Sequence, residues 1–535
     1  MMRRRAVTWS GVAVLFAALT VVMTWPLARN PGTLAPPHQD VFFNMWRLRW
    51  IAHALRTAPT HLFDANIYYP EKDTLAYSDA MLLEGLVAAP LAPLNPVRVH
   101  NLMMMLPMAA SAVALFALCW YLTGSRGAGV IAGTAFAFAP FRFEHIMHME
   151  IQWTVFMPLA FLALHRLLDR GQWRDGLALG ASLALQTLSC IYYGIFLACL
   201  TTAGTLGFIV WERHAGWRRV LPPLAAAAVL AVVVAGLYSI PYRRVHALVG
   251  DRGMEEVHMF SARPANYLNT PVGNSLYGNP GRPGLPERRL YPGAIVTLLA
   301  FAGLLLVTPS PRQIVYLLLL VLAFDLSLGF TGVTFPVLWY SAETFRSLRA
   351  LARLGVFVLM FLSVLAAYGY ATMVRSARPI VRFAVCACLV GGMLAEYWTT
   401  FAVSEYPASA PPVYRVLARL PKGVVAELPP PKVDRYMLEA RRAYFSTFHW
   451  FPLVNGYSGN FPPSYNMRME RMADFPSDTS LRQLQRDGVR YVVVHREAYT
   501  MRQLLTIYGR LSELGMAEVG TFDDSDAAAT LFIRR

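Results

Sequence analysis

The chain has 535 residues, of which 56% are hydrophobic and only 15% are charged. Soluble domains carry about 25% charged residues, so this composition excludes an ordinary soluble protein and predicts a polytopic α-helical membrane protein. The net charge of +16 does not gather in one patch. Basic residues fall instead in short clusters between hydrophobic stretches, as the positive-inside rule expects. We therefore expect membrane lipids or a phosphate-bearing lipid as partners, and no nucleic acid.

A membrane span needs about 20 mostly apolar residues, and about eleven stretches of the sequence qualify as candidates. Three arginines at positions 3–5 place the N-terminus in the cytoplasm, and arginines in the short loops support the same alternation. This topology predicts long outer loops at 29–99 and 241–291. The expected spans are 7–28, 100–123, 127–141, 152–168, 175–191, 192–211, 219–240, 292–308, 313–331, 350–373 and 380–401.

The sequence changes character after residue 401. The run 488–495 is almost continuously apolar, which is typical of a strand buried on both faces. We predict a transmembrane domain over 1–401 and an extracytoplasmic α/β domain over 402–535. The sequence contains no P-loop and no GxGxxG motif, so no nucleotide site is expected. Further strands are expected at 423–428 and 527–533, and helices near 479–487 and 500–514.

Asp40 lies in the first long loop with no other acid, Lys or Arg within six residues on either side. An acid at the edge of a membrane domain is costly and is therefore a functional hypothesis by default. A structural alternative is that Asp40 caps a helix over 41–55. The segment 41–56 is amphipathic, which predicts a helix in the plane of the membrane interface. Its arginines then serve as surface anchors.

A dense polar group is expected in the next outer loop. His145, His148 and Gln152 are spaced i, i+3 and i+7, which predicts one shared helical face joined by Glu144, with Glu150 offset. Carboxylates and imidazoles could bind a divalent cation, or they could position a phosphate or a sugar hydroxyl. The structural alternative is a hydrogen-bonded network at a helix end.

Further candidates are one acid and four arginines. Asp79 is the strongest candidate among the other acids of the first loop. Arg346, Arg349 and Arg353 have the spacing of one helical face, and guanidinium groups suit phosphate geometry. The alternative is that they reach to lipid headgroups at the interface. Arg263 lies in the second long outer loop, which we expect to cover the substrate.

With these features the sequence resembles the GT-C superfamily of integral-membrane glycosyltransferases, and more narrowly its bacterial protein-mannosyltransferase-like group. The resemblance implies an enzyme of the bacterial inner (plasma) membrane. Such an enzyme transfers a sugar from a polyprenyl-phosphate donor to an extracytoplasmic glycan, lipid or protein acceptor, usually with inversion. The stretches that carry the resemblance are 66–70, 137–143, 148–150 and 454–458, together with Asp40 after the first span.

The resemblance also implies roles for individual residues. Asp40 would act as the general base, and Glu150 would bind a metal ion or the acceptor. A magnesium or manganese ion is the cofactor to expect, although neither acid belongs to an Asp-X-Asp pair. The donor phosphate would be held by Arg346, Arg349 or Arg353. From their own positions in the sequence, and not from the resemblance, we add His145, His148 and Asp79 as acceptor or metal contacts and Arg263 as a further phosphate contact.

The chemistry of the residues agrees with these roles, because glycosyl transfer needs a base for the acceptor hydroxyl and cations for the leaving phosphate. Two other functions stay open from the sequence. A transporter or flippase would show inverted repeats and polar residues near the midplane, where Glu396 is the clearest acid. A non-catalytic assembly protein for envelope polysaccharide would fit the outer α/β domain equally well.

Overall fold

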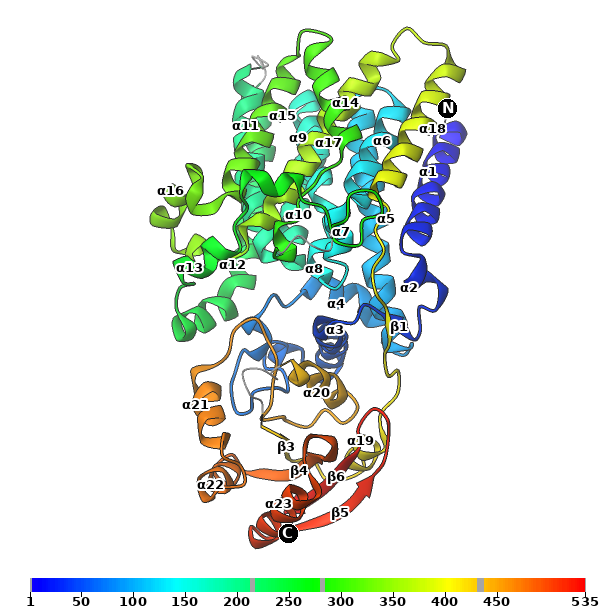
Figure 1. The fold of residues 1–535 in the computed structure, drawn as a ribbon. Coiled ribbons are helices and arrows are strands. Elements are labelled where there is room, and N and C mark those ends of the chain that lie inside the picture. Colours follow the sequence, from blue (N-terminus) through cyan, green and yellow to red (C-terminus); the bar gives the residue numbers. More distant parts are fainter. Residues whose placement is uncertain (1, 212–216, 280–283, 431–436, 535) are drawn as a thin grey trace. The chain divides into compact units, whose positions relative to one another are not determined.

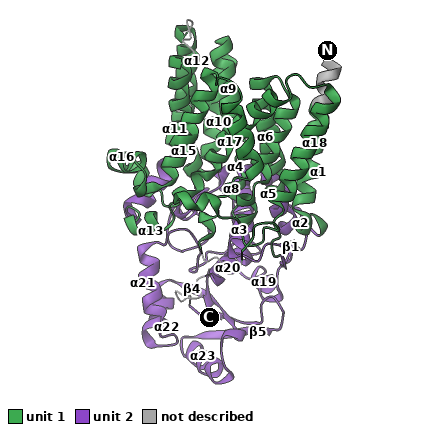
Figure 2. Cartoon of the chain, turned by 45° about the horizontal axis from the view of Figure 1, so that its top comes forward, with its two compact units in different colours: residues 1–29, 102–238, 251–402 green, residues 30–101, 239–250, 403–535 purple. Residues whose placement is uncertain are grey.

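The computed structural model describes residues 2–211, 217–279, 284–430 and 437–534, with the side chains of 2–8 left out. Contacts between residues divide the chain into two compact units (Figure 2). Unit 1 comprises Met1–Arg29, Leu102–Tyr238 and Asp251–Ala402. Unit 2 comprises Asn30–Asn101, Ser239–Gly250 and Val403–Arg535. Unit 2 therefore combines most of the first long loop with the C-terminal part.

Every expected span corresponds to a helix (Figure 1). Six helical stretches of the described residues are long and apolar enough to cross a membrane, so the chain is a multi-pass membrane protein; the count of eleven spans stays a prediction. The eleven helices are α1 (Met2–Met23), α5 (Pro96–Thr123), α6 (Arg126–Phe138), α9 (Phe156–Arg170), α10 (Trp173–Ser189), α11 (Ile191–Trp211), α12 (Trp217–Val249), α14 (Ala294–Leu305), α15 (Pro311–Ser327), α17 (Gly355–Met373) and α18 (Pro379–Tyr397). Short helices connect them: α2 (Trp25–Arg29), α7 (Pro140–Glu144), α8 (Met149–Gln152), α13 (Met254–Met259) and α16 (Thr334–Ser341).

Glycines bring helices α14 and α17 of unit 1 close together. A Cβ atom added to Gly369 would lie 1.8 Å from the carbonyl oxygen of Leu299, and one added to Gly303 would lie 2.7 Å from the backbone nitrogen of Gly369. Small residues of this kind allow helix backbones to approach in a membrane, where packing rather than the hydrophobic effect drives association. Large apolar side chains such as Val232 and Phe383 are more than two-thirds exposed, as expected for lipid-facing helices.

In unit 2, helix α3 (Gln39–Thr57) is buried rather than spread on a membrane surface. Trp46 is fully buried and Arg47 is 4% exposed, so the expectation of a surface anchor is wrong for Arg47. The indole of Trp46 donates to the side-chain oxygen of Asn66, whose amide donates to Ser446 and to the carbonyl of Phe451. Asn66 therefore joins α3 to the C-terminal part of the chain. The other elements of this region are β1 (Leu34–Ala35), α4 (Leu82–Ala88), β2 (Ser404–Glu405), which pairs antiparallel with β1, and α20 (Leu438–Ser446).

The C-terminal part holds a four-stranded mixed sheet in the order β3-β4-β6-β5. Strands β3 and β4 are parallel, and β6 is antiparallel to both β4 and β5. The three expected strands are present, whereas β5 was missed because its residues are mostly exposed or half-buried. The elements are α19 (Pro412–Leu417), β3 (Val424–Leu428), α21 (Pro463–Met472), α22 (Asp478–Arg486), β4 (Val489–His495), α23 (Met501–Glu513), β5 (Met516–Phe522) and β6 (Ala529–Arg534).

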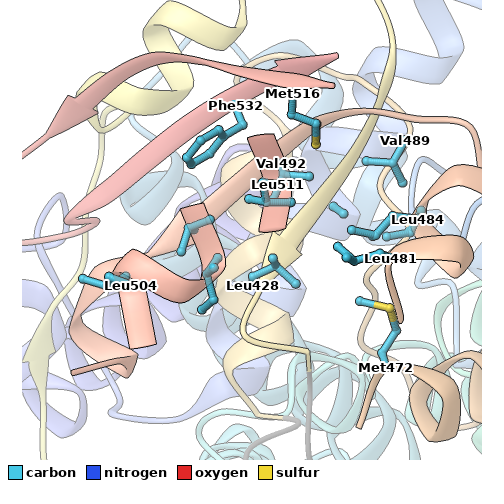
Figure 3. Packing of buried hydrophobic residues seen from close by; sticks show 14 residues of the cluster. Leu428, Met472, Leu481, Leu484, Val489, Val492, Leu504, Leu511, Met516 and Phe532 are labelled. Carbon is cyan, nitrogen blue, oxygen red and sulfur yellow. The ribbon is translucent and has the colours of Figure 1, made fainter. Parts of the chain in front are cut away.

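One hydrophobic core joins this sheet to its helices (Figure 3). Leu504, Ile507 and Leu511 recur at helical spacing on α23 and are buried in the same cluster as Val492 and Phe532. Each such side chain contributes about 1.5–3 kcal/mol when it is fully buried. The α/β fold of this part therefore follows from the apolar patterns of β4 and α23.

Candidate functional site

Asp40 lies in the first turn of α3 but does not cap it. The cap is His38, whose extended backbone precedes the helix and whose Nδ1 accepts a hydrogen bond from the backbone N–H of Asp40 at 3.2 Å. The alternative role of Asp40 as the N-cap is therefore wrong. A carboxylate in the first turn is favoured by the partial positive charge at the start of a helix.

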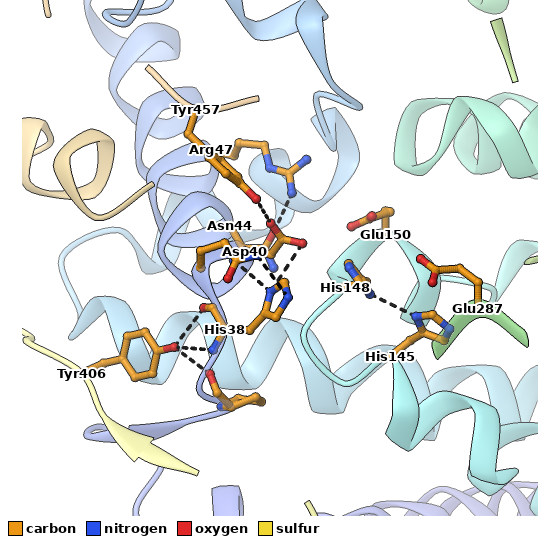
Figure 4. A network of polar contacts seen from close by, with 12 residues as sticks. His38, Asp40, Asn44, Arg47, His145, His148, Glu150, Glu287, Tyr406 and Tyr457 are labelled. Carbon is orange, nitrogen blue, oxygen red and sulfur yellow. Dashed lines mark hydrogen bonds and ion pairs between the residues drawn. The ribbon is translucent and has the colours of Figure 1, made fainter. Parts of the chain in front are cut away.

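The Asp40 carboxylate is held by a residue from the C-terminal part of unit 2 (Figure 4). The hydroxyl of Tyr457 donates to Asp40 Oδ1 at 2.8 Å, and His38 Nδ1 lies 3.6 Å from Oδ2. Tyr406 fixes the preceding backbone, because its hydroxyl donates to the carbonyl of Pro36 at 2.6 Å and accepts from the backbone N–H of His38 at 3.0 Å. The Asp40 side chain remains 20% exposed, so it can still meet a substrate.

The next turns of α3 carry a buried polar pair. Arg47 donates one hydrogen bond to the side-chain oxygen of Asn44 and another, 2.6 Å long, to the backbone carbonyl of Asp79. The structure thus brings the Asp79 backbone to the side of α3. No local pattern in the sequence distinguishes Arg47 from the other arginines of this helix, and it was missed. The role expected for the Asp79 carboxylate stays a prediction.

In unit 1 the polar segment at 140–154 is not one helix. Helix α7 ends at Glu144 and α8 begins at Met149, so the shared helical face expected for His145, His148 and Gln152 is wrong. The two histidines nevertheless meet, with their Nδ1 atoms 3.1 Å apart.

Arg142 explains the break between these helices. Its fully buried guanidinium donates to the carbonyls of Phe136 and Gln152 and to the hydroxyl of Thr154. The amide of Gln152 in turn donates to the carbonyls of Arg142 and His145. Side chains therefore satisfy backbone groups that a continuous helix would satisfy itself.

Glu150 lies in an ion-pair cluster with a residue that sequence reasoning missed. Arg353 Nη1 lies 3.8 Å from Glu150 Oε1, and Arg353 Nη2 lies 3.6 Å from Glu287 Oε1. Glu144 forms its own ion pair with Arg289. Figure 4 shows Glu150 and Glu287 together with His145 and His148. Glu287 belongs to a short 3-10 helix far from Glu150 in the sequence, and no spacing rule links the two.

The expected helical face of three arginines is also wrong. Arg346 and Arg353 lie in separate 3-10 helices, at Glu343–Ser347 and Leu351–Leu354, and Arg349 lies between them. Arg346 pairs with Asp251 at 3.7 Å, and Arg349 pairs with Glu256 at 2.8 Å. Arg353 does not share the acidic partners of Arg346 and Arg349, because it pairs with Glu150 and Glu287 instead.

Arg263 is exposed and precedes the 3-10 helix Pro264–Leu268. Its backbone N–H donates to the side-chain oxygen of Asn266 at 2.7 Å, so the backbone of this residue has a structural function as a cap. The side chain stays accessible, and its expected contact with a phosphate remains a prediction.

The side chains around Glu150 do not fit the expected magnesium or manganese ion. Magnesium takes six oxygen ligands, usually one or two carboxylates together with waters and substrate phosphates, and those carboxylates must be free to coordinate the ion. Within the described part of the chain, no group of three or more His, Cys, Asp and Glu residues could hold a metal ion. Glu150 and Glu287 instead share the guanidinium of Arg353.

The helices and the C-terminal sheet define a multi-pass membrane protein with the GT-C fold. The chain is similar to the crystal structure of ArnT from Cupriavidus metallidurans bound to undecaprenyl phosphate, with a TM-score of 0.53, 13% identity and coverage of 98% of both chains. This likeness confirms the fold that the sequence resemblance predicts.

Two further solved structures match with lower TM-scores. The apo structure of the same ArnT matches with a TM-score of 0.40 and 13% identity over 98% of both chains. The Archaeoglobus fulgidus oligosaccharyltransferase, tethered to an acceptor peptide, matches with a TM-score of 0.47 and 12% identity over 97% of this chain and 74% of that chain. No protein-family model matches the sequence, and no curated protein matches it.

Proposed function

We propose that this protein transfers a sugar from a polyprenyl-phosphate-linked donor to an extracytoplasmic acceptor, with inversion. The observation that carries the proposal is the partly exposed Asp40 carboxylate held at the start of α3 by the hydroxyl of Tyr457 at 2.8 Å. The fold supports it, because the similar ArnT structure is bound to undecaprenyl phosphate. The acceptor class is a glycan, a lipid or a protein.

In this proposal Asp40 is the general base. Its carboxylate takes the proton of the acceptor hydroxyl as the oxygen attacks the anomeric carbon, while the bond to the donor phosphate breaks. A single displacement of this kind inverts the anomeric centre. The hydroxyl of Tyr457 and the start of α3 both stabilise the charged carboxylate, which the base needs before it accepts the proton.

Arg346 and Arg349 are the residues we propose for the donor phosphate. They are 38% and 40% exposed, and they pair with Asp251 and Glu256. Guanidinium groups that reach the solvent can stabilise the charge that develops on the leaving phosphate. Arg263, which is exposed, is a further candidate. Arg353 is shared by two carboxylates and is the weaker candidate.

Glu150 is proposed to bind the acceptor. Its Oε2 atom is buried and has no hydrogen-bond partner among the described residues, so an acceptor hydroxyl or amine could satisfy it. His145, His148 and Asp79 are kept as further acceptor contacts. We place the protein in a bacterial inner membrane, with the N-terminus in the cytoplasm and residues 402–535 outside as a separate domain.

The test is complementation of a deletion strain of the native host with Asp40→Asn and Glu150→Gln. Both changes keep the shape of the side chain and remove its charge. Matched controls are Asp64→Asn, an acid of the same loop paired with His61 and Lys72, and Glu255→Gln, which is exposed. Lipid-linked sugars and envelope glycans are then profiled by mass spectrometry, at equal membrane levels of each variant.

The proposal requires that Asp40→Asn accumulates a polyprenyl-phosphate sugar and that one glycan loses a residue, whereas both control variants complement. If Asp40→Asn and Glu150→Gln behave as wild type while the deletion has a phenotype, the protein is not the transferase proposed. The protein is then a transporter or flippase, or a non-catalytic assembly protein for envelope polysaccharide.

A further inference from the structure

Arg353 bridges two acids that come from distant parts of unit 1. Its two terminal nitrogens lie 3.8 Å from Glu150 Oε1 and 3.6 Å from Glu287 Oε1. All three side chains are largely buried, with exposed fractions of 21% for Arg353, 14% for Glu150 and 13% for Glu287. One guanidinium therefore supplies the positive charge for two carboxylates in a partly desolvated place.

We propose that Arg353 is a built-in counter-cation that takes the place of a divalent metal ion between Glu150 and Glu287. The sugar transfer of this protein is accordingly independent of added metal. The claim that sugar transfer needs no metal rests on the proposed function. The claim that Arg353 excludes a metal ion concerns only Arg353, Glu150 and Glu287.

The electrostatics require a cation at this position. Two carboxylates repel each other strongly when they are removed from water, and they coexist in the charged form only with a positive group between them. The neighbouring acid, Glu144, has its own partner in Arg289. A planar guanidinium can face two carboxylates at once because its terminal nitrogens point in different directions.

The backbone that carries Arg353 is also fixed. The hydroxyl of Tyr192 donates to the carbonyl of Ala350 at 2.6 Å, and the hydroxyl of Tyr193 donates to the carbonyl of Arg353 at 3.4 Å. These two tyrosines of α11 tie down both ends of the turn that presents the guanidinium. Arg353 is therefore a positioned group and not a freely moving surface side chain.

Removal of the guanidinium leaves two acids that suit a hard cation. Carboxylate oxygens are the preferred ligands of manganese and magnesium, and water can complete the coordination shell. Arg353→Ala should thus create a manganese site that the wild-type chain lacks. Arg353→Lys keeps a positive charge and should not create it.

The experiment measures Mn²⁺ binding by electron paramagnetic resonance on the purified full chain in nanodiscs. Arg353→Ala should bind Mn²⁺ at least tenfold more tightly than wild type, and Arg353→Ala with Glu287→Gln should lose this gain. Arg349→Ala is the matched control, because Arg349 pairs with one acid, Glu256, that Arg252 also contacts. Size-exclusion profiles establish that each variant is folded. Arg353→Met, which also removes the charge but keeps a long side chain, replaces Arg353→Ala in the comparison with wild type if the alanine variant does not fold.

In parallel, wild-type sugar transfer is measured with and without EDTA, and it should be unchanged. The inference is overturned if EDTA abolishes transfer and Mn²⁺ or Mg²⁺ restores it. It is also overturned if folded Arg353→Ala binds Mn²⁺ no better than Arg349→Ala, or if Arg353→Lys binds it tightly. Because Mn²⁺ binding needs no donor or acceptor, absence of any sugar transfer would count against the proposed function alone.

Discussion

The hydroxyl of Tyr457 lies 2.8 Å from Oδ1 of Asp40, although 417 positions separate the two residues in the chain. Tyr457 follows strand β3 and helix α20 in the C-terminal part, and Asp40 stands at the start of α3. The C-terminal part of unit 2 therefore contributes a hydrogen-bond donor directly to the proposed base. The C-terminal part thereby helps to orient the Asp40 carboxylate.

We expect Tyr457→Phe to lower kcat of the proposed transfer by about tenfold or more, because a hydrogen bond to a charged group contributes about 1.5–3 kcal/mol. Steady-state rates of the purified chain at pH 7 measure this effect.

Tyr465→Phe is the matched control for this change. Tyr465 is buried in the same part of the chain, but its hydroxyl donates to the backbone carbonyl of Gly456 at 3.4 Å. This control should leave kcat close to that of wild type. A kcat of Tyr457→Phe equal to that of wild type would show that Tyr457 does not orient Asp40.

Arg142→Lys should destabilise the polar segment of unit 1. Arg142 is fully buried and donates to two carbonyls and one hydroxyl, and a lysine amine cannot reach all three. Each buried group left without a partner costs about 1–3 kcal/mol. The midpoint of thermal aggregation in detergent should fall by several degrees, whereas Arg174→Lys, at an exposed position, should not change it. Equal midpoints for the two variants would refute the assignment of Arg142 as the residue that holds this segment.

Gly369→Ala should loosen the contact between α14 and α17. The added methyl group would lie 1.8 Å from the carbonyl oxygen of Leu299, and no rotation of a side chain can relieve a clash between two backbones. The same substitution at Gly391 of α18 meets nothing within 4 Å and serves as the control. Thermal unfolding of the two purified variants should differ by several degrees, and a Gly369→Ala midpoint as high as that of Gly391→Ala would contradict the close packing.

The C-terminal part should become less stable as the pH rises through the range of one buried acid. Burial raises the pKa of Glu439 from 4.5 to about 7, although the neighbouring Arg442 opposes this shift. The folded state therefore binds the proton more tightly than the unfolded state does. The resulting stabilisation is complete below about pH 4.5 and is lost as the pH rises to about 7. It amounts to about 3 kcal/mol at most.

Hydrogen exchange of β3 in the full-length chain measures this effect. After correction for intrinsic exchange, the protection of β3 should fall between pH 4.5 and 7 in wild type and stay constant in Glu439→Gln. Glu513→Gln, at an exposed acid, should behave as wild type. A fall that persists in Glu439→Gln would assign the pH dependence to another group.

Elements with a local signal can be predicted from the amino-acid sequence alone. Long apolar runs predicted the helices of unit 1, and the apolar run at 488–495 predicted the central strand β4, because burial in lipid or between two layers demands such composition whatever the neighbours are. The sequence also singled out Asp40 as a candidate, since a lone acid beside a membrane span is costly and therefore conspicuous; its catalytic role stays a prediction. Strand β5 gave no such signal, because its exposed side chains need not be apolar.

Which polar groups meet depends on the tertiary structure. The pairs Asp40–Tyr457 and Arg353–Glu287 join distant segments, and such contacts depend on the packing of whole helices rather than on residue spacing. The break between α7 and α8 has the same origin, since the buried guanidinium of Arg142 donates to backbone carbonyls of α6 and α8. Local periodicity describes one helix at a time, whereas hydrogen bonds and ion pairs form wherever packing brings a donor to an acceptor.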